Sequence, residues 1–189
     1  ADEFVKAGGA DFGYETDWFK EITRVPVSTE HNLSLSGGME KVNYRASLNF
    51  KSNQGLSKNS SFQELIGRVN VNQKALNKML DLSYDLSYST TKSSWVDHPA
   101  FQQSIKYYPS APVYFDKSSA DYKTYGGYYQ NPLKIGFINP LSIVEQPTKD
   151  GQDQTFLGSI RATLTPVKGL KISGFGSYQL YNQTCGEYF

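Results

Sequence analysis

The sequence predicts an all-β fold, an antiparallel up-and-down meander with long irregular loops and one or two short helices. The first observation is alternation: Leu80–Tyr88 alternates large apolar with small polar residues without a break. A period of two places the apolar side chains on one face of a strand and the polar ones on the other. The second observation is that similar segments recur along the chain. The third is that short and long connections alternate between them.

Six segments are predicted to be strands. In the second of them, Tyr44, Ala46 and Leu48 alternate with Arg45 and Ser47. Outer-membrane barrels use strands of roughly ten residues with this pattern, and a large soluble sheet can use them as well. The expected strands span residues 31–37, 42–53, 62–73, 79–90, 156–165 and 170–181.

The lengths of the connections favour a barrel. The turns at 37–41, 74–78 and 166–169 are short, whereas the connections at 54–61 and 91–155 are long. In a meander every second connection lies on the same rim, so one rim carries only tight turns. Outer-membrane barrels have this asymmetry. The predicted fold is therefore an outer-membrane β-barrel.

Two short helices are expected outside the strands. Thr16 precedes a segment at 17–22 with acidic residues in its first turns, which predicts a helix with Thr16 as its N-cap. Residues 99–107 predict a second helix with Pro99 at its first position. A connection as long as 91–155 is uncommon unless it is functional or carries structure of its own.

Composition narrows the function classes. The chain has 189 residues, of which 38% are hydrophobic and 14% aromatic, and a net charge of +1. A barrel with a polar interior has such a composition, because only its lipid-facing side must be apolar. The charge balance argues against nucleic-acid binding. The single cysteine, Cys185, excludes an internal disulfide framework and a cysteine-based metal site.

The sequence contains no motif for catalysis or for a cofactor. We find no nucleophile elbow, metal cluster or convincing carboxylate pair, so we expect neither an enzyme nor a bound cofactor. No apolar run reaches the roughly 18 residues of a transmembrane helix. The chain has no initiator Met and stops soon after its last expected strand. We therefore expect residues 1–189 to be a fragment of a longer protein.

Several motifs, taken in order, resemble one family. Thr16–Arg24 contains Asp-Trp-Phe-Lys-Glu-Ile, His31–Gly38 is His-Asn-Leu-Ser-Leu-Ser-Gly-Gly, and Glu40–Tyr44 follows it. Further on come Tyr108–Tyr114 and Asn139–Leu141. Each motif alone is weak, but their order and spacing together resemble the barrel region of SusC/RagA-type TonB-dependent transporters over essentially the whole chain.

The resemblance implies a Bacteroidetes outer-membrane protein that imports glycans or peptides with energy from TonB. Family members have a large barrel around an N-terminal plug and pair with a SusD-like surface lipoprotein that acts as a lid. Residues 1–189 would then form a partial segment of a large outer-membrane β-barrel, with about six strands in contact with outer-membrane lipid. The plug and the segment that contacts TonB would lie outside them.

Strand alternation then assigns faces within such a barrel. The residues expected to face lipid on the fourth and sixth strands are Leu80, Leu82, Tyr84, Leu86, Tyr88, Leu170, Ile172, Tyr178 and Leu180. Arg45, Arg68 and Arg161 fall on opposite or mixed faces and are candidates for lining the lumen. There they would contact solute or pair with carboxylates of the plug.

Aromatic residues near the long loop are candidates for ligand or lid contacts, because they combine a large rigid apolar area with a polar tip. They are Trp95, Tyr107, Tyr108, Tyr125, Tyr128 and Tyr129. Packing within the loop is the alternative for most of them.

His31 and His98 lack partners at metal spacing and are expected to be structural, and Cys185 is expected to be inert.

A soluble β-sandwich that binds carbohydrate through the aromatic loop is the alternative to the barrel. It requires the apolar faces of different strands to pack against one another. A β-rich hydrolase is a third and weaker possibility, because the catalytic motifs are lacking.

Overall fold

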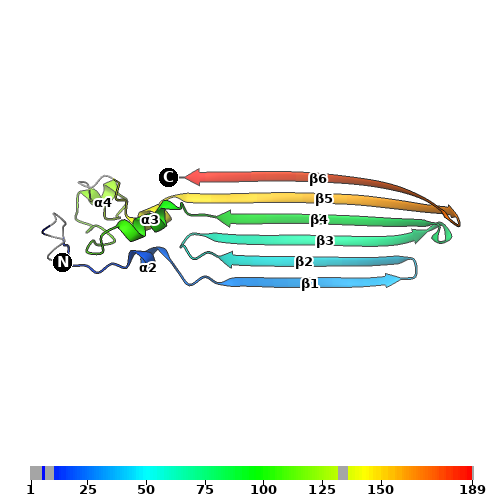
Figure 1. Ribbon diagram of the computed structural model, residues 1–189, viewed down its shortest axis with the longest axis horizontal. Helices are drawn as coiled ribbons and strands as arrows, with labels where there is room; N and C mark the ends of the chain where they lie inside the picture. Colours follow the sequence, from blue (N-terminus) through cyan, green and yellow to red (C-terminus); the bar gives the residue numbers. More distant parts are fainter. Residues whose placement is uncertain (1–5, 7–10, 132–135, 189) are drawn as a thin grey trace.

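The computed structural model describes residue 6 and residues 11–131 and 136–188. Its six strands form one antiparallel sheet in chain order, a simple up-and-down meander (Figure 1). The predicted all-β meander is therefore confirmed. The strands are β1 Ser28–Met39, β2 Val42–Gln54, β3 Ser61–Ala75, β4 Leu80–Ser94, β5 Thr148–Val167 and β6 Leu170–Tyr188.

Every strand is longer than the alternating pattern predicts. The largest differences are in β5, which begins at Thr148 rather than Phe156, and in β6, which continues to Tyr188 rather than Tyr181. Apolar alternation stops where both faces of the strand become polar, but the backbone hydrogen bonds of a ladder need no such alternation. Pairing therefore continues past the last apolar residue, as in Lys92 opposite Gln152.

The sheet forms a single layer. Within the described residues no helix and no second sheet packs broadly against either face. Leu33 and Ile172 accordingly remain 71% and 56% exposed. The β-sandwich alternative is wrong for this structure, because a sandwich buries its apolar faces between two sheets.

The buried core lies beyond one end of the sheet, in a unit that we call the cap. The cap consists of α2 (Trp18–Ile22) and the described part of residues 95–147, which contains α3 (Pro99–Lys106), α4 (Asp121–Thr124) and α5 (Pro140–Glu145). It lies on the rim of the long connections (Figure 1). The long connection thus carries its own structure. The buried residues of its two clusters are Trp18, Tyr107, Tyr108 and Ala111, and Ile22, Ala100, Leu141 and Val144.

The two expected helices are present, with one correction. The N-cap of α2 is Asp17, whose carboxylate accepts a hydrogen bond from the Lys20 N–H at 3.0 Å. The predicted N-cap, Thr16, instead donates its hydroxyl to the Ala111 carbonyl at 2.7 Å. Thr16 therefore joins α2 to the long loop, a role that only the tertiary structure reveals. Helix α3 begins at Pro99 as expected.

Candidate functional site

One face of the sheet, which we call the outer face, carries a continuous apolar band. The strand register sets Leu48, Gly67, Tyr88, Phe156 and Leu180 side by side in one row across five strands. Rows of the same kind continue down β4 to Leu80, which pairs with Leu164. The band is about nine to eleven residues long, the length that a tilted strand needs to cross the hydrocarbon core of a bilayer.

The band contains the residues that the sequence predicts to face lipid. Ile172 pairs with Leu164, and Tyr178 and Leu180 lie in the rows of Leu86 and Tyr88. Leu170 pairs with Val167, just past a register irregularity that follows Leu164. These side chains therefore share one face, as the alternation predicts.

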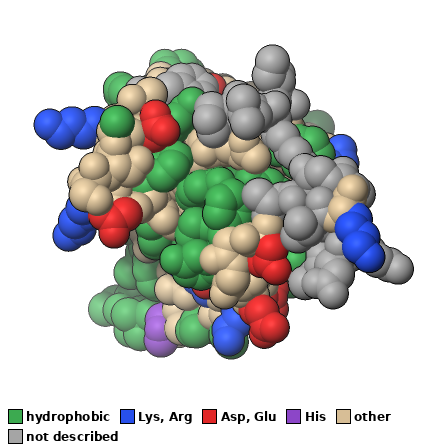
Figure 2. Space-filling view, turned by 90° about the vertical axis from the view of Figure 1, so that its left-hand side faces the viewer, with side chains coloured by type: hydrophobic (Ala, Val, Ile, Leu, Met, Phe, Trp, Pro, Cys, Tyr) green, Lys and Arg blue, Asp and Glu red, His purple; other side chains and the backbone are tan. Residues whose placement is uncertain are grey.

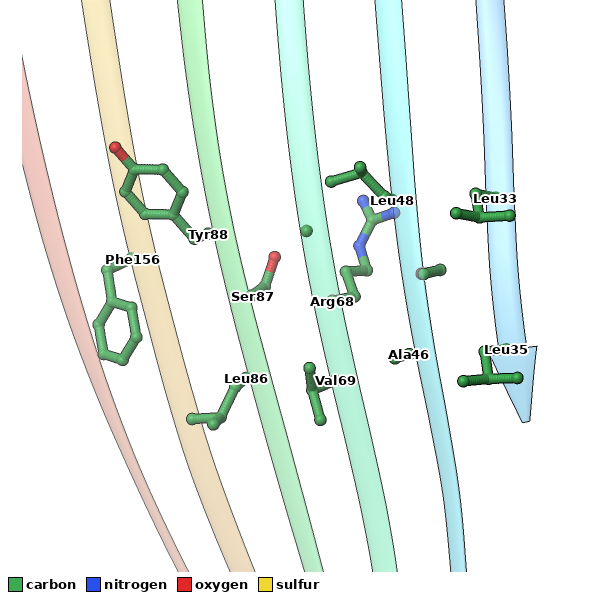
Figure 3. A pocket seen from close by; sticks show the side chains of 12 residues that line it. Leu33, Leu35, Ala46, Leu48, Arg68, Val69, Leu86, Ser87, Tyr88 and Phe156 are labelled. Atoms are coloured by element: carbon green, nitrogen blue, oxygen red, sulfur yellow. The ribbon is translucent and has the colours of Figure 1, made fainter. Parts of the chain in front are cut away.

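A shallow apolar hollow of about 380 Å³ lies within the band (Figure 3). Leu33, Leu48, Leu86 and Tyr88 are among its lining residues, and Gly67 lies among them. A Cβ atom at Gly67 would lie 4.0 Å from the Leu48 Cδ1 atom, so the glycine leaves open space between larger neighbours.

The opposite face, the inner face, carries the three predicted arginines. The register sets Arg68 opposite Ser87, Arg45 in the row of Asp85, and Arg161 opposite Ser83. The three arginines thus occupy consecutive rows of one polar face. Among the described residues none of them forms an ion pair.

Two contacts modify the electrostatics of the inner face. The guanidinium of Arg161 lies 5.1 Å from the centroid of the Phe175 ring, a cation–π geometry. The Asn70 amide donates to the Asp85 carboxylate at 2.5 Å. Asp85 therefore has a hydrogen-bond partner within the sheet.

The predicted aromatic site divides into two places. Tyr125, Tyr128 and Tyr129 lie together in the cap, where the Phe115 ring packs against Tyr125 and Tyr129 at 6.0 and 5.0 Å between centroids. Gly126 and Gly127, with φ of 63° and 89°, form the turn that brings these residues together. Trp95 lies apart from them, where the cap joins the sheet.

Tyr128 is anchored within the cap. It packs against the cluster that contains Leu141, and its hydroxyl donates to the Glu145 carboxylate at 2.7 Å. Burial, and then the hydrogen bond to Glu145, raise the pKa of Tyr128 above its usual range.

Tyr107 and Tyr108 are buried still more deeply. Their rings stack 4.8 Å apart, and Trp18 donates its indole N–H to the Tyr108 carbonyl at 3.0 Å. These two tyrosines thus belong to the core of the cap.

Asn139 organises the cap, and the sequence analysis did not single it out as a functional side chain. It is fully buried, and its amide donates to the carbonyls of Val113 at 2.8 Å and Tyr129 at 3.1 Å. Its Oδ1 atom accepts from the Leu141 N–H, as an N-cap of α5 does. The Asn-Pro pair at 139–140 is the signal that could have identified it, because Asn is a preferred N-cap and Pro a preferred first helical residue.

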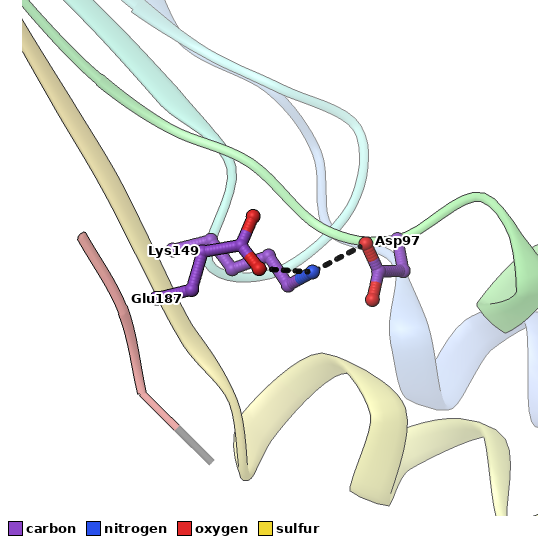
Figure 4. Close-up of polar contacts among 3 residues, drawn as sticks. All are labelled: Asp97, Lys149 and Glu187. Atoms are coloured by element: carbon purple, nitrogen blue, oxygen red, sulfur yellow. Dashed lines mark hydrogen bonds and ion pairs between the residues drawn. The ribbon is translucent and has the colours of Figure 1, made fainter. Parts of the chain in front are cut away.

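A buried lysine joins the cap to the sheet. Lys149, at the start of β5, is 9% exposed, and its ammonium lies 2.8 Å from Asp97 and 3.4 Å from Glu187 (Figure 4). Asp97 belongs to the cap and Glu187 to the end of β6. Nearby, a Cβ atom at Gly151 would lie 3.0 Å from the Trp95 indole, so a larger residue there would crowd the ring that packs against β5.

Lys149→Gln is expected to loosen the cap from the sheet, because both carboxylates lose their cationic partner. We expect faster limited proteolysis between residues 95 and 98. Lys168→Gln, at an exposed turn on the opposite rim, is the matched control and should leave cleavage unchanged. Equal cleavage of both variants and the unaltered chain would show that Lys149 does not hold the cap.

The histidines and the cysteine stand apart from any cluster of metal ligands. His31 stacks on Phe50 at 6.4 Å, His98 precedes α3, and Cys185 is an exposed free thiol. Among the described residues, no three His, Cys, Asp or Glu side chains are placed to hold a metal ion. None of the described helices has the length and hydropathy required to cross a bilayer.

The fold and its two faces define a class: an open section of the wall of a large antiparallel barrel, like that of TonB-dependent transporters. The comparisons confirm the resemblance to the SusC/RagA type. The TonB-dependent receptor SusC of Bacteroides thetaiotaomicron is 32% identical over 134 residues, 69% of this chain and 13% of that protein. The TonB-dependent receptor P26 of Formosa agariphila is 24% identical over 151 residues, 79% of this chain and 14% of that protein.

Solved structures show the same fold. The closed-closed state of the RagAB peptide importer matches with a TM-score of 0.66 and 20% identity, over 92% of this chain and 20% of that chain. Its open-open state matches with a TM-score of 0.61 and 19% identity, over 92% of this chain and 19% of that chain.

No protein-family model matches the sequence. These relatives are named as receptors and importers rather than as enzymes, in agreement with the sequence expectation. The chain spans less than a sixth of the curated relatives.

Proposed function

We propose that this chain is part of an outer-membrane transporter that imports glycans or peptides with energy supplied through TonB. The observation that carries the proposal is the division of the one-layer sheet into an apolar outer face and a polar inner face. A barrel wall needs both, because lipid contacts one side and water the other. The names of the relatives, SusC and the RagAB peptide importer, support the choice of function.

In this proposal the inner face lines the lumen. Arg45, Arg68 and Arg161 then project toward the transported solute or toward carboxylates of a plug domain. Plug contact is the simpler role, since a plug fills the lumen of such a barrel and unpaired arginines attract its acidic residues. Residues 1–189 would form about six strands of the barrel domain, one part of the wall.

The cap lies on the rim of the long loops, which in outer-membrane barrels is the extracellular rim. A SusD-like lipoprotein acting as a lid would meet the chain there. Figure 2 shows this end of the molecule, where hydrophobic side chains gather near the centre and charged ones lie around them. Exposed apolar residues of the cap include Phe19 (50%), Ile105 (84%) and Tyr114 (52%). Such a surface suits a protein partner. Trp95, Tyr125, Tyr128 and Tyr129 remain proposed ligand or lid contacts.

Tryptophan scanning with brominated lipid tests which face meets the bilayer. Leu86 and Ser87 are neighbours on β4 and lie on opposite faces. In the chain refolded into vesicles, Leu86→Trp should be strongly quenched by brominated acyl chains. Ser87→Trp, at the same depth on the inner face, should be quenched much less.

The native Trp18 and Trp95 lie in or beside the cap, so the unaltered chain supplies the background for both variants. Equal quenching of Leu86→Trp and Ser87→Trp would overturn the assignment of faces. A chain that does not co-float with vesicles would overturn the proposed membrane location itself.

A further inference from the structure

The outer face changes from apolar to polar toward the cap. The apolar hollow reaches the row of Tyr88 and Phe156 (Figure 3). Two rows of polar side chains follow it on β3 to β6, and we call them the polar strip. In order toward the cap they are Thr90, Gln154 and Asn182, and then Gln63, Lys92, Gln152 and Thr184. The apolar band therefore ends at hydrogen-bonding groups on the same face of the sheet.

The polar strip offers one cation among neutral groups. The row of Lys92 lines a hollow of about 550 Å³. Lys92 is exposed and forms no ion pair with any described residue. Its neighbours on the strip are amides and hydroxyls, and the Gln152 amide contacts the Thr90 hydroxyl at the long distance of 3.4 Å. These groups therefore retain the capacity to donate and to accept hydrogen bonds.

A carboxylate lies just beyond the strip. Asp150 is one row nearer the cap than Gln152, and it accepts a hydrogen bond from the Ser94 hydroxyl at 2.6 Å. Its remaining lone pairs can accept from the hydroxyl groups of a ligand. From the band outward, the face thus presents apolar side chains, then amides and hydroxyls around Lys92, and then an acceptor.

We infer that the polar strip binds the headgroup of a phosphorylated glycolipid, an acylated sugar phosphate whose acyl chains lie on the apolar band. The amides and hydroxyls of the strip bond to sugar hydroxyls, and Lys92 pairs with a phosphate. This inference rests on the proposed membrane location of the outer face and goes beyond it, because it names one lipid class and the residues that select it.

The position of the strip fits the outward leaflet of the membrane. The strip lies toward the long connections, which in outer-membrane barrels are on the extracellular side. The rings of His31 and Phe50 stack at 6.4 Å in the row of Thr90, and aromatic rings gather where the hydrocarbon meets the headgroups. The strand rises about 7 Å from Thr90 to Lys92. The lysine is therefore at the height of the headgroups.

The width of the strip favours a sugar headgroup over a glycerol headgroup. Neighbouring strands lie about 4.8 Å apart, so the polar groups on β4 to β6 extend over about 10 Å. A phosphorylated disaccharide presents hydroxyls over such a width and a phosphate to Lys92. The headgroup of phosphatidylglycerol also carries a phosphate, but its single small glycerol can contact few of the amides. Charge alone would thus hold both lipids, whereas the amides and hydroxyls select the glycolipid.

A competition between two anionic lipids tests the site. The chain is refolded into vesicles of equimolar phosphatidylglycerol and lipid A, an acylated disaccharide phosphate, then extracted in mild detergent and analysed by native mass spectrometry for retained lipid. We expect lipid A to be retained preferentially. Lys92→Gln should lower its retention about two- to five-fold, as the loss of an exposed charge contact does, and should not lower that of dephosphorylated lipid A. Gln152→Leu should shift the preference toward phosphatidylglycerol, because a sugar hydroxyl loses its partner.

Two variants of the inner face are the matched controls. Lys51→Gln, opposite Glu64, and Gln183→Leu, opposite Asp153, lie at nearly the same height as Lys92. Both should leave retention and preference unchanged. Equal retention of the two lipids by the unaltered chain, equal effects of the outer-face and inner-face variants, or an effect of Lys92→Gln that persists with dephosphorylated lipid A would overturn the glycolipid site while leaving the membrane location intact. Failure of the chain to enter vesicles would overturn both.

Discussion

Leu86→Arg is expected to lower the free energy of unfolding of the bilayer-inserted chain by about 2–4 kcal/mol, the cost of an arginine on the lipid face at the midplane. Leu86 lies in the apolar band, one row from Tyr88 and three rows from Leu80. A guanidinium there loses its hydration and gains no partner. Ser87→Arg places the same group one residue along on the inner face, where Arg68 already lies opposite Ser87.

Urea unfolding in vesicles measures both variants, because the midpoint falls with the free energy when the slope is unchanged. Ser87→Arg should lower the free energy of unfolding by well under half as much as Leu86→Arg. The loss that it does cause should come from repulsion by Arg68. The pair shares chain position, depth and introduced side chain, so the difference reports only the face. Equal losses would show that lipid does not contact the outer face.

The faces could be predicted from the sequence because alternation is local. Each apolar residue of Leu80–Tyr88 is set on one face by its own strand, whatever the neighbouring strands do. The tight turns then kept the strands in chain order. The strands were predicted too short. In β4, both faces are polar beyond Thr90, so the apolar alternation gives no signal there, although the hydrogen-bonded ladder continues to Ser94.

The cap could not be predicted in the same way. Trp18 meets Tyr108 across 90 residues of chain, and Thr16 meets Ala111 across 95. Contacts of this kind depend on the sheet, which brings the segment before β1 close to the connection after β4. Tyr107 and Tyr108 therefore looked like exposed aromatic candidates, whereas they form part of the core. Lys149 likewise acquires Glu187 only when β5 and β6 pair, and Asp97 only when the segment after β4 lies beside the start of β5.

Asn139→Ala is expected to destabilise the cap by about 3 kcal/mol, because it leaves buried backbone groups without partners, each costing about 1–3 kcal/mol. The carbonyl of Val113 and the N–H of Leu141 lose their bonds to the Asn139 side chain. The carbonyl of Tyr129 keeps a second donor, the Tyr107 hydroxyl at 3.1 Å, so the loss is smaller there. Hydrogen exchange of the α5 amides measures the effect, since local opening of the cap exposes them.

Asn139→Ser separates the two functions of the side chain. A serine can still cap α5, but it cannot donate to the carbonyls of Val113 and Tyr129, so its effect should be intermediate. Asn182→Ala, at an exposed position of β6, should leave the α5 amides protected.

If the cap opens in Asn139→Ala while exchange in β2 and β3 stays slow, the cap and the sheet are separate cooperative units. A lid partner could then reshape the rim without disturbing the wall. Simultaneous loss of protection in both would instead make the cap part of the stability of the wall, because its contacts at Lys149 would transmit the opening into β5.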